Sequence, residues 1–223
     1  MHQPEPGDVV RDWNLEVMAV GPLQMNAVLL TAPGPGSGPG EAILIDPGEE
    51  PERLLAAIGA SGCRLVALLA THGHFDHVGS AARIQQDWDL PLRCHRGDLE
   101  FIRRLPEIQA QYGFPASAIP RCEPDLDDNT TIPFADGFIE VRHVPGHSPG
   151  QVMFVLPGHA VVGDCVFQGS IGRTDLPGGD FDVLAKSIRE RIYTLPDDTV
   201  IVAGHGPDTS VGREKTTNPF VQG

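Results

Sequence analysis

One short segment of the sequence gathers four side chains of types that bind metal ions. It reads THGHFDH over residues 71–77 and directly follows the apolar run 65–70. If the segment leaves a strand in extended form, His72, His74 and Asp76 share one face, because side chains alternate every two residues, and His77 turns away as a helix begins. The segment therefore predicts ligands for two metal ions.

Three further candidate ligands come after apolar runs elsewhere in the chain. They are His147, Asp164 and His205, and each has a glycine beside it. Glycine lets the backbone come close to a crowded site. Because ligands collect at the carboxyl ends of strands in sheets covered by helices, we expect all of these side chains to meet at one edge.

The seven candidate ligands are imidazoles and carboxylates, with no thiol among them. This set suits zinc, iron or manganese, and three protein ligands per ion leave positions open for water and substrate. Two neighbouring divalent ions can lower the pKa of a water to about 7 and polarise a carbonyl group. The residues thus predict a catalytic centre with two divalent ions, with zinc as the first expectation and Fe or Mn as alternatives.

The complete ligand series resembles that of the metallo-β-lactamase superfamily. The motifs are HGHFDH over 72–77, GHSPG over 146–150, GD at 163–164 and GHG over 204–206. The resemblance spans about residues 15–220 and implies an α/β (α+β) fold, an αββα sandwich of two mixed β-sheets with helices on the outer faces. It also implies which ligands bind which ion. The first metal would be bound by His72, His74 and His147, and the second by Asp76, His77 and His205. Asp164 would bind both.

Two finer motifs resemble the glyoxalase II (hydroxyacylglutathione hydrolase) branch, in its short form without the C-terminal helical domain. They are GSIGRTD over 169–175 and TNPF over 217–220. The branch implies a thioesterase acting on S-2-hydroxyacylglutathione substrates such as S-lactoylglutathione. In that hypothesis a metal-bound hydroxide attacks the thioester carbonyl and Asp76 helps to orient it. A thiolate leaves easily, because a thiol with a pKa near ~8.5 needs little protonation.

Other activities remain open from the residues. The persulfide dioxygenases are similar to this branch and hold one iron through positions that align with His72, His147 and Asp164, so metal content separates the two hypotheses. A metallo-hydrolase of another small ester or lactam is a further alternative. A non-catalytic binding domain is disfavoured because the ligand set is complete.

Substrate contacts are harder to derive. Arg173 is the best candidate for an anion contact, and the alternative is an ion pair with Asp175 or Asp180. Phe75 and Phe167 flank ligand residues and are candidates for lining the pocket, with core packing as the alternative for both. The thiol of the residue after Asp164, Cys165, is expected in the core, since strand alternation points it away from its neighbour.

Strands and helices recur in the order needed to position these residues. Two β-rich halves with helices outside are expected, within one domain over 1–223. A Pro/Gly-rich loop over 33–40 is expected to be a flexible surface loop inside a hairpin rather than a domain boundary or a lid. The predicted strands are 15–20, 26–31, 42–45, 64–70, 92–95, 138–144, 151–156, 160–163 and 199–203; the predicted helices are 51–58, 78–88, 98–113 (interrupted at Pro106) and 181–194.

Composition limits the partners. The chain has 223 residues and a formal net charge of −14, which disfavours nucleic acid as a partner. No run approaches the ~18 apolar residues of a membrane span, and the first residues lack the features of a signal peptide. The four cysteines are widely spaced, as in a reduced protein. We expect a cytoplasmic protein that binds a small thioester and no membrane; the sequence leaves its oligomeric state open.

Overall fold

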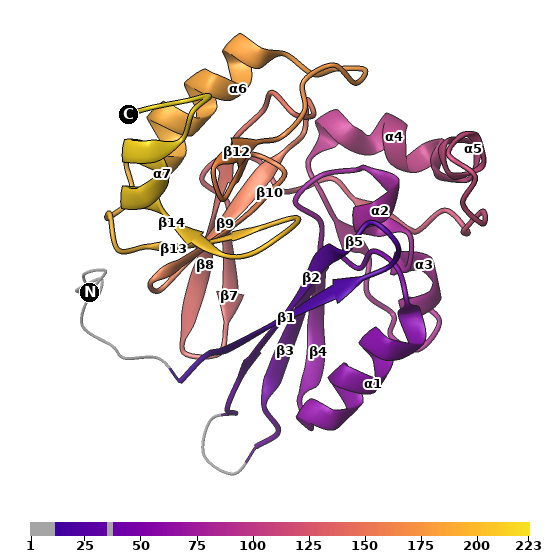
Figure 1. The fold of residues 1–223 in the computed structure, drawn as a ribbon. Coiled ribbons are helices and arrows are strands. Elements are labelled where there is room, and N and C mark those ends of the chain that lie inside the picture. The colour runs from indigo at the N-terminus through magenta and orange to yellow at the C-terminus, as the bar shows by residue number, and fades with distance from the viewer. Residues whose placement is uncertain (1–11, 35–37) are drawn as a thin grey trace.

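The computed structural model describes residues 12–34 and 38–223. Within these residues two six-stranded mixed sheets pack face to face, and helices cover the outer face of each (Figure 1). The expected αββα sandwich is therefore confirmed. Helices α1 (Pro51–Ser61) and α3 (Ala81–Ile84) lie on the N-terminal sheet, and α6 (Phe181–Ser187) and α7 (Val211–Thr217) lie on the C-terminal sheet.

The N-terminal sheet begins as an antiparallel meander and continues as a parallel sheet. The first three strands pair antiparallel, as the absence of a helix between them predicts, and the next three pair parallel. In spatial order the strands are β1 (Asn14–Val20), β2 (Met25–Ala32), β3 (Glu41–Ile45), β4 (Arg64–Leu69), β5 (Leu92–Arg93) and β6 (Cys122–Glu123).

The C-terminal sheet is also mixed: β10 and β13 pair parallel, and every other pair of neighbouring strands in this sheet is antiparallel. A short hairpin follows the metal-ligand candidate Asp164 and consists of β11 (Val166–Phe167) and β12 (Ser170–Ile171). In spatial order the strands of the sheet are β14 (Thr209–Ser210), β13 (Val200–Ala203), β10 (His159–Gly163), β9 (Val152–Leu156), β8 (Gly137–His143) and β7 (Thr131–Phe134).

Alternation along the strands divides the apolar residues among three layers. On β3, Leu44 packs towards the helices of the first layer, whereas Ile43 and Ile45 face the second sheet. On the other sheet, Phe154 faces inward and Met153 packs against the helical layer that contains Leu184. Strands buried on both faces read as continuous apolar runs, which is why the central strands were predictable.

Two helix predictions are wrong in extent. Of the predicted helix 78–88, only the last residue of α2 (Phe75–Val78) and the four residues of α3 are helical, and turns occupy 79–80 and 85–87. Gly79 and Ser80, which separate the two helices, are weaker helix formers than alanine. The helix predicted over 98–113 is split into η1 (Arg96–Asp98), α4 (Leu99–Arg103) and α5 (Leu105–Gln111). The break before Pro106 follows from its missing N–H and the clash of its ring with the preceding turn. Helix α6 continues as a π-helical turn, η2 (Ile188–Ile192).

The short strands β6, β7, β11, β12 and β14 and helix α7 were not predicted. Strand β7 contains Pro133, which a sheet tolerates at its edge. The loop at 33–40 does connect two antiparallel strands, but its residues 35–37 lie outside the described residues. No described helix has the length and hydropathy needed to span a membrane.

Candidate metal centre

The ends of four strands bring the candidate ligands together. His72 follows β4, His147 follows β8, Asp164 follows β10 and His205 follows β13, and these strand ends meet at one edge of the two sheets. All seven side chains fall into three overlapping groups whose ligand atoms lie within 4.8 Å of one another. The convergence inferred from the sequence is present in the structure.

Three imidazoles form the first group, which we call the histidine triad: His72, His74 and His147. The Nδ1 atom of His74 lies 3.1 Å from Nε2 of His72 and 2.9 Å from Nε2 of His147. The three rings meet edge to face, with centroids 4.6–4.9 Å apart. Three nitrogens of different rings therefore point at one small space.

A second group, the mixed triad, contains Asp76, His77 and His205. Asp76 Oδ2 lies 3.3 Å from His205 Nε2 and 3.8 Å from His77 Nε2. Asp164 joins the two triads, because its Oδ1 lies 3.5 Å from His77 Nε2 and its Oδ2 lies 3.6 Å from His147 Nε2. The position of this carboxylate is the one that the resemblance gives to a ligand shared by two ions.

The local conformation of the motif corrects one expectation. The extended stretch ends at His74, and α2 begins at Phe75, so Asp76 and His77 are consecutive residues in the first turn of a helix. Asp76 therefore does not share the extended face of His72 and His74, as alternation had predicted. The helix turns both side chains towards His205 instead.

The outer ring nitrogens are held by acceptors in the protein. Nδ1 of His147 lies 2.7 Å from the carbonyl oxygen of Arg173, and Nδ1 of His205 lies 3.0 Å from that of Leu23. A ring that donates its Nδ1–H to a carbonyl leaves Nε2 free of hydrogen and directed inward. Both rings are thus held in the tautomer that a metal ligand needs.

Two buried ligand atoms have no hydrogen-bond partner in the described part of the chain, although they lie 3.5 Å from each other. They are Nε2 of His77 and Oδ1 of Asp164. A buried polar atom without a partner costs about 1–3 kcal/mol, and a charged one costs more. Divalent cations at the two triads would satisfy both atoms, and the nitrogen and oxygen donors fit such ions. The residues present therefore fit a pair of divalent metal ions.

Burial keeps two rings of the histidine triad, His72 and His74, neutral. Burial, followed by the charge of His77, lowers the pKa of His72 well below its ordinary value. Burial and then His147 lower the pKa of His74 to about 4. Metal ligands must be deprotonated, so these rings are ready to bind a cation at neutral pH.

Opposite charges control the mixed triad. Burial alone would raise the pKa of Asp76 and of Asp164, but His77 and then other histidines outweigh it, and both pKa values are lowered. Burial alone would lower the pKa of His77, but Asp76, Asp46 and Asp164 raise it well above its ordinary value. The carboxylates therefore create a strong demand for positive charge at this subsite.

Asp46, which was not predicted from the sequence, supports the mixed triad. Its Oδ2 lies 2.9 Å from Nδ1 of His77 and accepts a hydrogen bond of 2.7 Å from the Thr71 hydroxyl, while its Oδ1 accepts one of 2.6 Å from the Thr71 N–H. Asp46 directly follows the apolar strand β3. This is the same signal, a polar residue after an apolar strand, that identified the other candidates.

Asp98, which was not predicted from the sequence, is a buried carboxylate that joins the two ligand loops. It accepts hydrogen bonds from the Gly73 N–H at 2.9 Å, the Ser148 hydroxyl at 2.6 Å and the Gly150 N–H at 2.7 Å. Gly73 separates His72 from His74, and Ser148 follows the third member of the histidine triad. Burial raises the pKa of Asp98, against the effect of the three donors. Nothing in its sequence neighbourhood signals this role.

Of the three side chains predicted to contact substrate, one lies in an ion pair, one packs in the core and one lies at the rim of the centre. Arg173 forms a two-point ion pair with Asp175, at 2.8 Å for both bonds, as the structural alternative predicted. Phe75 packs on the rings of two aromatic neighbours and on the helix-side core. The Phe167 ring lies 6.3 Å from that of His205, at the rim of the mixed triad. Cys165 is fully buried, as expected.

The sandwich and the cluster at its edge define a class: a metal-dependent hydrolase with a histidine- and carboxylate-rich centre. Comparison with known proteins agrees, because the family model described as the metallo-beta-lactamase superfamily matches residues 20–205. The chain belongs to the metallo-β-lactamase superfamily.

Two relatives illustrate its neighbourhood. The chain is 39% identical over 214 residues to "Hydroxyacylglutathione hydrolase GloC" of Haemophilus influenzae, covering 93% of this chain and 98% of the relative. It is 34% identical over 210 residues to "Probable metallo-hydrolase YqgX" of Bacillus subtilis, covering 92% and 96%. Both matches extend over almost the whole of each chain.

Two solved structures have a similar sequence identity to this chain. "TTHA1623 in a di-iron-bound form" is 40% identical with a TM-score of 0.81, and the match covers 92% of this chain and 100% of that one. "BLEG-1 B3 metallo-beta-lactamase" is 32% identical with a TM-score of 0.82, covering 94% and 100%. The first of these two structures is described as di-iron-bound.

Proposed function

We propose that the chain is a dinuclear metal-dependent thioesterase that hydrolyses S-2-hydroxyacylglutathione substrates such as S-lactoylglutathione. The observation that carries the proposal is the pair of complete triads joined by Asp164, with no thiol among the ligands. The similarity to a hydroxyacylglutathione hydrolase over 98% of its length supports the substrate class. We further propose a cytoplasmic setting, which the four free cysteines support.

In this proposal the histidine triad holds one ion, the mixed triad holds the second, and Asp164 contacts both. Two divalent ions, zinc first and iron or manganese as alternatives, would supply a Lewis acid for the thioester carbonyl and a lowered pKa for water. The ligand set is rigid because carbonyl groups and Asp46 fix the outer nitrogens of the rings.

Asp76 is the proposed catalytic carboxylate. Its lowered pKa keeps it ionised, so it can accept a hydrogen bond from the attacking water and hold that proton away from the carbonyl. Its side chain and that of His205 are 12% and 27% exposed, whereas that of His77 is fully buried. Substrate therefore approaches from the side of His205, and the thiolate departs without a protein acid.

Three side chains are proposed to touch the substrate. Phe167 stands at the rim beside His205, and Arg173 lies next to the histidine triad through its carbonyl group. The Arg173 guanidinium would have to bind an anionic group of the substrate in addition to Asp175. Phe75 contributes less directly, since its ring is packed against its aromatic neighbours.

Release of thiol tests the proposal. Protein purified without chelators and loaded with zinc, iron or manganese is incubated with S-lactoylglutathione and acyl-CoA esters, and free thiol is measured with a disulfide reagent. We expect hydrolysis of S-lactoylglutathione that the His147→Ala variant loses. If metal-loaded protein leaves every thioester intact, the proposed activity is wrong; oxygen uptake with glutathione persulfide and one bound iron would support a dioxygenase instead.

A lactam is the second candidate substrate. The similarity to a structure described as a B3 metallo-beta-lactamase, with a TM-score of 0.82, supports this alternative. Hydrolysis of a chromogenic cephalosporin by the metal-loaded protein, measured beside S-lactoylglutathione, separates the two. We expect the thioester to have the higher kcat/KM.

A further inference from the structure

Two motifs noted in the sequence meet in the structure. The segment 169–175 contains strand β12, and the segment 217–220 begins at the last residue of helix α7. The side-chain amide of Asn218 donates a hydrogen bond of 2.9 Å to the carbonyl oxygen of Ser170. The candidate metal centre accounts for part of the first motif, through the carbonyl group of Arg173, and for no residue of the second. The contact between the motifs points to a shared role.

A fully buried carboxylate lies at this contact. Glu214, on α7, is 0% exposed. Its Oε2 accepts hydrogen bonds of 2.9 Å from the Gly169 N–H and from the Asn218 amide, and its Oε1 accepts one of 2.6 Å from the Thr209 hydroxyl. Glutamate is almost never fully buried unless it is paired. Two of the three partners come from the β11–β12 hairpin and from the end of α7, so the carboxylate joins these two segments.

Asn218 uses both ends of its amide. Its oxygen accepts from the N–H groups of Phe220 and Val221, at 3.0 and 3.3 Å. Its nitrogen donates to Glu214 and to the Ser170 carbonyl, both at 2.9 Å. A carboxylate at this position has no hydrogen to donate, so it would keep the first two bonds and lose the other two.

The hairpin depends on contacts of this kind. Each of its strands has two residues, and two strands alone are marginally stable at best in water. Its tip is joined to the rest of the described chain by the bonds to Glu214 and Asn218 and by one from the Gln168 amide to the Asp208 carbonyl, which is longer at 3.5 Å. Glu214 and Asn218 therefore fix the tip of the hairpin.

The base of the hairpin lies against two ligands of the candidate centre. Asp164 precedes it, and Arg173, which follows it, provides the carbonyl that accepts from Nδ1 of His147 at 2.7 Å. The Gly172 N–H donates to the Cys165 carbonyl at 3.1 Å. An added Cβ on Gly172 would collide with the Asp164 carbonyl oxygen and would lie 3.2 Å from Nδ1 of His147. A shift of the hairpin would therefore move the carbonyl that fixes the His147 ring.

We propose that Glu214 and Asn218 are positioning residues of the metal centre. They hold the tip of the hairpin, and the hairpin holds the Arg173 carbonyl against the outer nitrogen of His147. Loss of such an outer partner lowers metal affinity by about 10–100-fold. The proposal rests on the proposed binding of a metal ion by the histidine triad, and it is independent of which substrate is hydrolysed.

Four variants test the proposal. Asn218→Asp removes the donor to Ser170 and keeps the acceptor for the end of the chain. Glu214→Leu removes the acceptor for Gly169 without adding a charge, and it serves if the first variant does not fold. Glu214→Gln is the conservative variant, because its oxygen can replace Oε2 and the Thr209 hydroxyl can accept from its nitrogen. Thr209→Val is the matched control, since it removes the bond to Oε1 and leaves both bonds to the hairpin in place.

Hydrogen exchange and zinc affinity are measured on each variant. Exchange of peptides over 165–173 is followed by mass spectrometry in the zinc-loaded protein, and zinc affinity is obtained by competition with a chromophoric chelator. We expect Asn218→Asp and Glu214→Leu to exchange at least about tenfold faster over the hairpin and to bind zinc about tenfold more weakly. Glu214→Gln and Thr209→Val should stay within about twofold of the wild type in both measurements.

Two results would overturn the proposal. One is a zinc affinity within about twofold of the wild type in Asn218→Asp and Glu214→Leu, even if both variants unfold at lower urea concentration. The other is an equal loss of zinc affinity in Thr209→Val, because any weakening at the end of α7 would then have the same effect. Neither measurement uses a thioester, so a wild type that hydrolyses none would refute the proposed activity and leave this test unchanged.

Discussion

The Asp98→Asn substitution should weaken metal binding from a position outside the ligand set. In the wild type, Oδ2 of Asp98 accepts from the Gly73 N–H and the Ser148 hydroxyl, and Oδ1 accepts from the Gly150 N–H. The two N–H groups use different oxygens. Asparagine offers one oxygen, so one of these N–H groups loses its acceptor in either orientation of the amide.

The expected size follows from that loss. A buried N–H without an acceptor costs about 1–3 kcal/mol, which sets the expected fall in the free energy of unfolding. The two loops that Asp98 joins carry the histidine triad, and loss of such an outer partner lowers metal affinity by about 10–100-fold. Replacement by alanine would remove all three hydrogen bonds and cost more.

Two measurements distinguish positioning from stability. Urea unfolding of chelator-treated protein gives the free energy, and competition with a chromophoric chelator gives the zinc affinity. Asp127→Asn is the matched control, because Asp127 forms an exposed ion pair with Arg96 and such pairs contribute about 0–1 kcal/mol. If Asp98→Asn loses stability but binds zinc within twofold of the wild type, the reasoning about positioning is refuted.

Three further predictions concern single groups and the metals. Arg173→Gln should raise the pKa of Asp175 from about 2 towards the usual 3.8, because hydrogen bonds from Arg173 lower it. The contribution of this ion pair to stability is present above about pH 4 and is lost as the pH falls through about 2. An unchanged titration of the Asp175 carboxyl group by NMR would contradict this prediction. His205→Ala should reduce the metal content from two ions to one per chain, whereas His159→Ala, outside the centre, should keep two. Equal loss of metal from the two variants in elemental analysis would refute the assignment. Chelation should lower Tm by about 8–16 °C for each ion removed, since an ion at a thousand times its Kd stabilises by about 4 kcal/mol. A Tm unaffected by chelator and by re-added zinc would be inconsistent with bound ions.

The sequence was most informative where a candidate metal ligand directly follows an apolar strand. The strand before residue 71 and those before His147, Asp164 and His205 were located, and so was the edge where they meet, because double-sided burial produces long apolar runs. Asp46 carries the same pattern after β3 and was within reach of this reasoning. The resemblance implied the αββα arrangement, and the order of these elements predicted two β-rich halves with helices outside.

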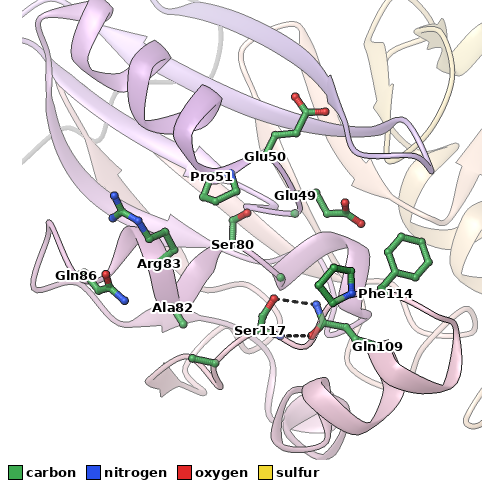
Figure 2. Close-up of a pocket in the computed structure, with 14 residues that line it drawn as sticks. Glu49, Glu50, Pro51, Ser80, Ala82, Arg83, Gln86, Gln109, Phe114 and Ser117 are labelled. Atoms are coloured by element: carbon green, nitrogen blue, oxygen red, sulfur yellow. Dashed lines mark hydrogen bonds between the residues drawn. The ribbon is translucent and has the colours of Figure 1, made fainter.

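Features set by tertiary contacts were not accessible in this way. The start of α2 at Phe75 moves Asp76 off the extended face, and this turn packs closely against Gly48, which is distant in the sequence. Asp98 joins loops that are 25 and 50 residues away in sequence, and only the fold brings them together. A cavity beside α1 and α3 likewise has walls from three distant segments, 48–51, 79–86 and 109–118 (Figure 2).

The central claim is that seven side chains form one centre for two divalent ions. Anomalous diffraction from crystals of protein purified without chelators, recorded at the absorption edges of zinc and iron, tests it most directly. We predict two peaks, one within the histidine triad and one within the mixed triad, with Asp164 next to both. A single peak, or peaks away from these residues, would contradict the account.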